Sequence, residues 1–424
     1  MVCRSAVVTA VRRLVSRVVR SNVTHTAIVN YSSLLITAGA SVLVARLLGP
    51  EGRGEYAAIM TWFGLALVVG EFGQSGAITH WVARFPQRAS MMVASARLIT
   101  VGGAVIVGTA AMVTAPWLAG GDEELTIAYW IVFLGCFANG VLGPYTYAAQ
   151  AISIRAWNLI RVSQPLIYVL LVVAFALSSR LTIVTLALAL TISTVFQHII
   201  AGVIARSLQA VRGSTSRRDL EMLARYGAAY AGSQVPATVG GQYDKAYLSQ
   251  TVPGQDLGQY AVAGTIASLS TPLATAISSV VFPRMSADRS DARARVRLEN
   301  RSLAVTAFAT GIAVFTLAAI ASPLVSAVFG AEFQPAVELV WWLVPATLCH
   351  ALSEIIAVLI RSRSRPGQVT VARLVSLAVG AGSIVPLVKV ADVTGAAISL
   401  TLLEVTMLVV SAVVLARLRK VARV

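Results

Sequence analysis

Twelve apolar segments, separated by short polar or charged connections, follow one another along the chain. Each segment has about 20 or more predominantly apolar residues, which is the length that a helix needs to cross a bilayer. A helix also satisfies its own backbone hydrogen bonds inside the hydrocarbon region. The pattern therefore predicts an all-α polytopic membrane protein with 12 transmembrane helices. The segments, numbered spans 1 to 12, cover residues 26–48, 56–79, 93–118, 126–151, 158–178, 181–205, 226–252, 258–283, 303–329, 337–360, 367–388 and 395–416.

The basic residues between the spans indicate the orientation of the chain. When the connections are assigned to alternate sides of the membrane, 29 of the 34 Lys and Arg residues fall on one side, and Lys245 lies inside span 7. Cytoplasmic connections carry an excess of Lys and Arg. We therefore expect both termini in the cytoplasm, together with the connections 206–225 and 284–302. The basic residues on the opposite side are Arg46, Arg53, Arg180 and Lys389.

The composition narrows the class of protein. Of the 424 residues, 57% are hydrophobic and 12% are charged, so the apolar side chains cannot be hidden in one water-soluble core. The net charge of +16 could indicate a nucleic acid partner, but the basic residues are spread between apolar spans, so no nucleic acid is expected. Cys136 and Cys349 lie within spans, where cysteine behaves as a small hydrophobe. The four histidines lack the spacing of metal ligands, so neither a metal nor another cofactor is expected.

A short motif recurs at an offset of 204 residues. Residues 54–57 read Gly-Glu-Tyr-Ala, and residues 258–261 read Gly-Gln-Tyr-Ala. Duplication of a six-span unit is the simplest explanation, with chance matches among small residues as the alternative. Because six is even, both copies would enter the membrane in the same orientation. The expected domains are a basic N-terminal segment (1–25), a first six-helix bundle (26–205), a cytoplasmic linker (206–225), a second six-helix bundle (226–416) and a basic tail (417–424).

The N-terminal segment places valines and a leucine at helical spacing with four arginines among them. This pattern is typical of a basic amphipathic helix on the cytoplasmic membrane surface, attracted to anionic lipid. A disordered basic tail that only fixes orientation is the alternative. The longest connections elsewhere, 206–225 and 284–302, leave no room for a water-soluble domain. A membrane glycosyltransferase would be expected to carry a sizeable catalytic loop, so the chain is not expected to be an enzyme.

Several short motifs, in this order, resemble one known family. In the first half, residues 48–50 read Leu-Gly-Pro, 54–56 read Gly-Glu-Tyr and 71–78 read Glu-Phe-Gly-Gln-Ser-Gly-Ala-Ile; in the second half, Asp244 precedes Gly-Gln-Tyr at 258–260 and Phe-Pro-Arg-Met-Ser at 282–286. Together they resemble the oligosaccharide flippases of the multidrug/oligosaccharidyl-lipid/polysaccharide (MOP) exporter superfamily, of which O-antigen flippases are the best-known branch. The length, the twelve spans and the two halves agree with this resemblance over nearly the whole chain.

The resemblance implies a function. Such proteins are thought to flip a polyprenyl-pyrophosphate-linked oligosaccharide from the cytoplasmic to the outer leaflet, by alternating access, for cell-surface polysaccharide biosynthesis. It also implies a bacterial plasma membrane location, and membrane lipids, a polysaccharide polymerase and glycosyltransferases as partners. Two alternatives are a cation-coupled multidrug exporter of the same superfamily and a non-transporting membrane scaffold for polysaccharide assembly.

Polar residues within spans 1 and 7 are candidates for facing the sugar, because a sugar headgroup needs hydrogen-bonding groups where water is scarce. The main ones are Asn30 and Tyr31 in span 1 and Gln242 in span 7. Polar side chains also hold membrane helices together, so each one can instead be structural.

Charged residues within spans are the sharper candidates, because a charge in the bilayer is costly. The substrate and coupling candidates among them are Glu71, Asp244, Lys245 and Glu354. The resembled family also has an Asp at the position of Asp244, so we expect Asp244 to be a coupling or gating carboxylate, with Glu71 and Glu354 as secondary candidates. Lys245 could receive a pyrophosphate. For each of these residues, a structural ion pair is the alternative.

Overall fold

The computed structural model describes residues 22–208, 213–272, 274, 277, 292–363 and 365–421. These residues are mostly helical and contain no strand, which confirms the all-α prediction. The segment predicted as an N-terminal amphipathic helix lies, up to residue 21, outside them. The helices are α2 (Asn22–Gly70), α3 (Gln74–Arg84), α4 (Ala89–Leu118), α5 (Glu123–Ile152), α6 (Ile154–Leu177), α7 (Ile183–Ser207), α8 (Arg217–Gly240), α9 (Tyr243–Thr251), α10 (Gly254–Ser268), α12 (Ala292–Ala319), α13 (Ala321–Val328), α14 (Ala336–Arg361) and α15 (Pro366–Val421), with short 3₁₀ turns at Pro86–Arg88 and Ala331–Phe333.

Helices α2 and α15 are each long enough for two crossings. Their 49 and 56 residues correspond to about 74 and 84 Å at 1.5 Å per residue, more than twice the hydrocarbon thickness of about 30 Å. Helix α2 turns at Gly49, whose φ of 68° is left-handed, and α15 turns at Asp392, with φ 46°. Both turns fall in connections that the sequence predicts, between spans 1 and 2 and between spans 11 and 12.

Eight helices among the described residues are long and apolar enough to cross a membrane, with α2 and α15 counted once each. The chain is therefore a multi-pass membrane protein. The structure differs from the prediction inside two spans. Span 2 is interrupted by a turn at 71–73, where Phe72 and Gly73 both have positive φ. Span 7 is interrupted at residues 241–242, between α8 and α9.

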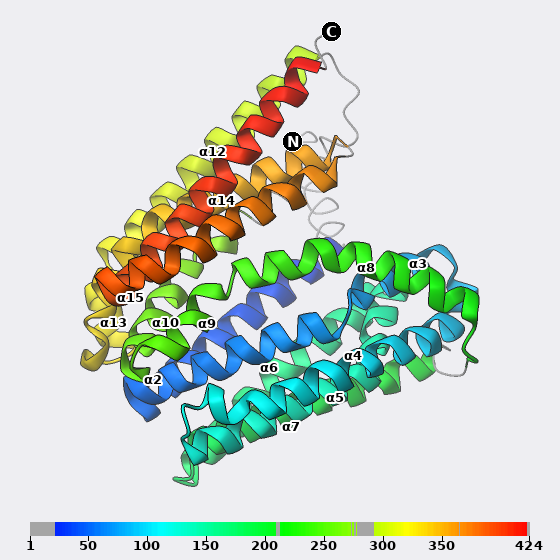
Figure 1. The fold of residues 1–424 in the computed structure, drawn as a ribbon, viewed down its shortest axis with the longest axis horizontal. Helices are drawn as coiled ribbons and strands as arrows, with labels where there is room; N and C mark the ends of the chain where they lie inside the picture. Colours follow the sequence, from blue (N-terminus) through cyan, green and yellow to red (C-terminus); the bar gives the residue numbers. More distant parts are fainter. Residues whose placement is uncertain are drawn as a thin grey trace, which may run out of the picture. The chain divides into compact units, whose positions relative to one another are not determined.

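One compact unit consists of the described parts of Met1–Ser41, Val69–Pro116 and Thr126–Ala231. Within it, α6 lies alongside α7 (Figure 1). Small residues allow close helix packing, as membrane interfaces generally require: the Thr100 hydroxyl of α4 donates to the Gly140 carbonyl of α5 at 2.6 Å. The fully buried Asp219, in the first turn of α8, pairs with Arg88 at 2.6 Å.

The second compact unit consists of Val42–Val68, Trp117–Leu125 and the described parts of Gly232–Val424. Within it, α14 lies alongside α15, α12 and α10, and Figure 1 shows α12, α14 and α15 as long neighbouring ribbons. The buried core includes Tyr260 and Phe333. These units are defined by packing, whereas the bundles 26–205 and 226–416 are inferred from a sequence repeat, so the bundle boundaries stay a prediction.

An ion cluster joins three helices at one end of the second unit. Glu299 of α12 is fully buried and accepts from Arg363 at 2.6 Å and from Arg419 at 2.8 Å. Arg363 follows α14, and Arg419 lies in the last turn of α15, where it also donates to Asn300 at 2.9 Å. One carboxylate therefore holds the ends of α12, α14 and α15 together.

Candidate functional site

The interruption of span 7 places non-helical backbone within a predicted span of the second unit. Helix α8 contains Pro236 and ends at Gly240, and α9 begins at Tyr243 after Gln242. Proline removes a helical hydrogen bond and glycine tolerates non-helical backbone, so this sequence favours a break. Non-helical backbone at membrane depth is tolerated only where it is buried in protein or lines a cavity. In transporters, such broken helices mark binding sites.

A pocket lies at this break, between the end of α8 and the helices α14 and α15. Its cavity volume is about 70 Å³, counting the space that the centre of a water molecule can reach. A cavity of this size has room for several water molecules. The lining residues are Pro236, Ala237, Gly240, Gly241, His350, Ser353, Glu354, Arg373, Ser376, Leu377, Leu403, Glu404 and Met407.

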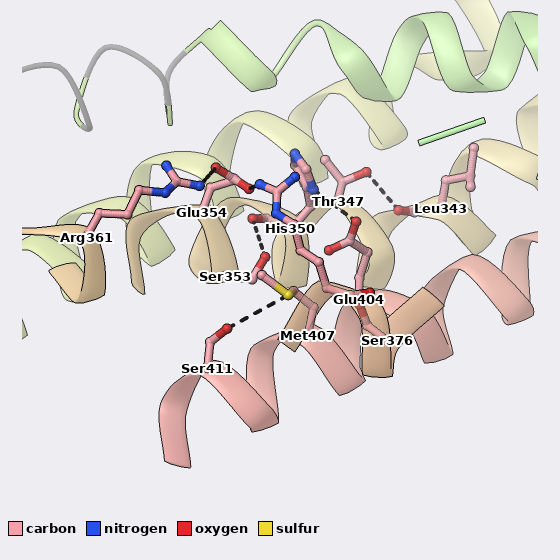
Figure 2. A network of polar contacts seen from close by, with 11 residues as sticks. Leu343, Thr347, His350, Ser353, Glu354, Arg361, Ser376, Glu404, Met407 and Ser411 are labelled. Atoms are coloured by element: carbon pink, nitrogen blue, oxygen red, sulfur yellow. Dashed lines mark hydrogen bonds and ion pairs between the residues drawn. The ribbon is translucent and has the colours of Figure 1, made fainter. Parts of the chain in front are cut away.

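His350 and Glu404 form a hydrogen-bonded pair in the pocket. Nδ1 of His350 on α14 lies 3.0 Å from Oε1 of Glu404 on α15, and the two side chains are 42% and 12% exposed. Both groups lie well inside the membrane helices: His350 is about 21 Å along α14, taking 1.5 Å per residue. Figure 2 shows the two side chains pointing toward each other from different helices.

Glu354 belongs to an ion pair in the same pocket. Its Oε1 lies 2.5 Å from Nη2 of Arg373, and its Oε2 lies 3.9 Å from Nη2 of Arg361. Glu354 is one turn beyond His350 on α14, and Figure 2 shows both on the same side of that helix. Of the predicted site residues, Glu354 is the one that lines the pocket. The structure gives it two guanidinium partners, which fit the structural ion pair that the sequence left open as the alternative.

Asp244 lies in the first turn of α9, directly after the break, and is 2% exposed. Its Oδ2 accepts a 2.7 Å hydrogen bond from the hydroxyl of Tyr260, which is itself buried, and its Oδ1 has no hydrogen-bond partner in the described part of the chain. A buried acceptor without a partner is costly, and in native proteins such a group has a specific explanation, such as a functional role or a bound water or ion. Asp244 therefore keeps its place as a candidate.

Lys245 and Gln242 contact each other beside the break. Nζ of Lys245 donates to Oε1 of Gln242 at 3.3 Å. The neighbouring carboxylate of Asp244 is bonded to Tyr260 instead, and no ion pair joins it to Lys245. Adjacent helical residues point about 100° apart, which explains this separation.

The remaining predicted residues lie in the first unit. Glu71, at the turn that interrupts span 2, accepts from the backbone N–H of Ser75 at 2.8 Å and hydrogen-bonds the side chain of Tyr147. Asn30 accepts from Nη1 of Arg161 at 3.0 Å. Tyr31, next to Asn30, is 45% exposed. These three residues therefore belong to a different compact unit from Gln242, Asp244, Lys245 and Glu354.

The sequence places Arg161 at the inner end of span 5, where it could meet a phosphate or snorkel to lipid headgroups, but it does not show the contacts of this residue. Its guanidinium carbon lies 4.3 Å from the ring centroid of Trp157, one turn earlier on α6. This stacking and the bond to Asn30 hold the guanidinium in one orientation, with donors left over. The i, i+4 spacing of Trp157 and Arg161 was a signal for the contact. His350 and Glu404 were missed as a pair because no sequence pattern relates two positions 54 residues apart.

Comparisons with known proteins agree with this architecture. A family model described as polysaccharide biosynthesis protein matches residues 19–288, more than half of the chain. No curated protein sequence matches the chain. Among solved structures, the lipid II flippase MurJ in an inward closed conformation is similar at a TM-score of 0.78 and 14% identity, covering 93% of this chain and 87% of that one.

Two transporters of the MOP superfamily are also similar. An inward-facing multidrug resistance MATE family transporter gives a TM-score of 0.73 at 14% identity, covering 94% of this chain and 99% of that one. A MOP superfamily transporter from Pyrococcus furiosus gives 0.62 at 13% identity, covering 95% and 96%. At such low identities the likeness establishes the fold alone, and that fold is the one that the sequence motifs led us to expect.

Proposed function

Because the chain belongs to the polysaccharide biosynthesis protein family, we propose that it flips a polyprenyl-pyrophosphate-linked oligosaccharide from the cytoplasmic to the outer leaflet of a bacterial plasma membrane, by alternating access. Its fold is shared with proteins that are described as a flippase and as transporters, not as enzymes. The observation that carries the proposal is a charged pocket at a broken span, in a membrane protein of a polysaccharide biosynthesis family.

The chemistry of the cargo explains why such a protein is needed. Sugar hydroxyls and a pyrophosphate lose their hydrogen bonds to water in hydrocarbon, at a cost of several kcal/mol for each group. A path lined by polar side chains replaces those bonds, while the polyprenyl tail stays in lipid. In the first unit, Asn30, Tyr31 and Arg161 are suited to the headgroup. We assign the phosphate to Arg161, because a guanidinium donates two parallel hydrogen bonds to phosphate oxygens.

Asp244 is proposed to control the movement. Asp244 lies at the start of α9, directly after the break in span 7, so a change in its charge acts next to the part of the helix that can bend. Glu71 is the matching carboxylate in the first unit, where it lies at the start of the turn that interrupts span 2. Lys245 is proposed to attract the cargo phosphate toward the break, and Gln242 orients its ammonium group.

The cellular setting follows from the same proposal. Both termini lie in the cytoplasm, because the connections on that side carry most of the Lys and Arg. Two six-helix bundles, 26–205 and 226–416, form the moving parts. A polysaccharide polymerase and glycosyltransferases are the protein partners, since they produce or consume the lipid-linked sugar.

A multidrug exporter is the second candidate function, favoured by the similarity to the MATE family transporter. The two functions predict different results when the gene is deleted. A flippase leaves a polyprenyl-linked sugar on the cytoplasmic leaflet and reduces surface polysaccharide, whereas an exporter changes drug susceptibility and leaves the polysaccharide intact. A scaffold would also reduce the polysaccharide, so the deciding experiment is reconstitution: the purified chain in liposomes should move a fluorescent polyprenyl-pyrophosphate oligosaccharide between leaflets. Failure of the purified chain to do so contradicts the proposal.

A further inference from the structure

The pocket at the break in span 7 contains two carboxylates that have different kinds of partner. Glu354 has two guanidinium partners, Arg373 at 2.5 Å and Arg361 at 3.9 Å. Glu404 has the imidazole of His350 at 3.0 Å. An arginine is always charged, so Arg373 places a permanent positive charge beside Glu354. Histidine gains and loses its proton near neutral pH, so the charge on the pair of His350 and Glu404 can change.

The geometry points to His350 and Glu404 as a proton-exchanging pair that couples proton movement to translocation of the cargo, an inference that rests on the proposed function. When the imidazole is neutral and Glu404 is ionised, the pair has a net charge of −1. Uptake of one proton from water in the pocket gives an imidazolium beside a carboxylate, with a net charge of zero. Release of that proton to the water on the other side of the membrane restores the starting charge, and no other bond changes.

The charged and titratable groups around His350 and Glu404 explain why this pair is suited to binding a proton. From α14, Glu354 and Cys349 are close enough to act electrostatically, and from α15, Arg373 does. From α9, Tyr243 lies near Glu404, and its hydroxyl bonds Ser399 at 2.9 Å. The part of α8 that lines the pocket has no titratable side chain. Because Arg373 is already held by Glu354, the negative charge of Glu404 is met chiefly by His350.

The position of the pair links its charge to a conformational change. The same pocket is lined by Gly240 and Gly241, where span 7 is interrupted. A group whose protonation differs between two conformations shifts their populations by that difference in proton affinity. The His350 side chain is 42% exposed and lines the pocket, so the imidazole is not sealed off by the protein around it. The charge of the pair and the bend of span 7 can therefore change together.

The test uses the full-length protein in proteoliposomes with a fluorescent polyprenyl-pyrophosphate oligosaccharide, with and without a pH gradient. We expect the gradient to accelerate flipping severalfold in the wild type. His350→Gln and Glu404→Gln should flip at one rate whether or not the gradient is present. His80→Gln, which alters an exposed histidine stacked on Tyr226 in the first unit, is the matched control and should keep the acceleration.

A second measurement follows the protonation of His350 directly and does not depend on transport. In protein labelled with ¹⁵N-histidine, the imidazole signal that is absent from His350→Gln should change from protonated to neutral between roughly pH 5 and 8, and Glu404→Gln should shift that transition. A His350 signal that stays constant overturns the inference, even if a variant fails to fold. Acceleration that persists in either variant also overturns it, as does a wild-type protein that flips cargo with no response to the gradient, although the proposed function then stands. A wild-type protein that moves no cargo contradicts both the proposed function and this inference.

Discussion

Gly54 and Gly258 make the same backbone contact in opposite directions. A Cβ atom on Gly54 would overlap the carbonyl oxygen of Gly254, and a Cβ on Gly258 would overlap the carbonyl oxygen of Pro50. Gly258 is the counterpart of Gly54 in the repeat of 204 residues, and Gly254 is the counterpart of Pro50. Gly54 therefore contacts residue 254 of the second copy, and Gly258 contacts residue 50 of the first copy. Two copies of a unit related by a two-fold axis would make this kind of contact, so the duplication is a prediction worth testing by comparing the two halves.

Adding one methyl group at this contact should destabilise the fold. Gly54→Ala places its Cβ against backbone that cannot rotate away, and overpacking of this kind costs about 1–3 kcal/mol. Gly64→Ala, on the same helix with no atom within 4 Å of the added Cβ, is the control. It should leave the stability unchanged or raise it by up to about 1 kcal/mol, through helix propensity. Thermal unfolding in detergent measures both, and equal midpoints would contradict the contact.

Removing the carboxylate of Glu299 should be among the most damaging single changes. Glu299→Gln leaves the guanidinium groups of Arg363 and Arg419 without their shared anion, and breaking a buried ion pair in this way costs about 3–5 kcal/mol. Glu221→Gln, in an exposed pair with Arg217, should change the stability by less than about 0.5 kcal/mol. The readout is the unfolding midpoint of each purified variant, and a Glu299→Gln protein as stable as the Glu221→Gln protein would refute the role of the cluster.

Replacement of Asp244 by asparagine separates charge from shape. The amide oxygen of Asp244→Asn can still accept from the Tyr260 hydroxyl, so the variant should fold with a normal unfolding midpoint. If Asp244 controls the movement, flipping in proteoliposomes should fall at least tenfold, a loss equivalent to about 1.4 kcal/mol in the barrier. Tyr247→Phe, on the same short helix, should keep the wild-type rate. Full polysaccharide export by a folded Asp244→Asn protein would eliminate the functional role and leave the structural one.

Arg161 should affect cargo affinity. Arg161→Ala removes a charge-assisted hydrogen bond worth about 1.5–3 kcal/mol, so the cargo concentration for half-maximal flipping should rise roughly 10- to 100-fold. Arg161→Lys keeps the charge but loses the planar stacking on Trp157, and should give an intermediate value. Arg155→Ala, an exposed arginine at the start of the same helix, is the control. An Arg161→Ala protein with unchanged half-saturation would remove Arg161 from the phosphate site.

The orientation of the chain can be tested by labelling single cysteines in intact cells. Cys3, Cys136 and Cys349 are first replaced by alanine. Ser214→Cys, in the connection expected in the cytoplasm, should then resist a membrane-impermeant thiol reagent, whereas Gly121→Cys, in the exposed turn before α5, should react. The reverse pattern would place both termini outside the cell and overturn the topology.

The sequence was most informative for features that depend on a continuous stretch of chain. The lengths of apolar runs are dictated by bilayer thickness, so the spans and the turns at Gly49 and Asp392 were predictable. The interruption of span 7 was less so, although Pro236 and the adjacent pair Gly240 and Gly241 were visible. Hydropathy averages over a whole span and does not detect a two-residue break.

The candidate site depends on contacts between helices, which no periodicity specifies. Glu354 was recognisable as a costly intramembrane charge, but its partner Arg373 was counted only as a basic residue near a membrane boundary. His350 is 54 residues from Glu404, and their pairing follows from how α14 lies along α15. Asn30 was expected to face sugar, whereas its observed partner is Arg161. Residue types could be chosen from the sequence, but their partners could not.

The break between α8 and α9 also bears on how the chain reaches the membrane during synthesis. Neither helix is among the eight that are apolar and long enough to cross on their own, and α9, with nine residues, spans only about 14 Å. The insertion machinery selects segments by their own transfer free energy. Span 7 is therefore expected to enter the bilayer only with the help of neighbouring helices, so the part of the chain that lines the pocket depends on other helices for its insertion during synthesis.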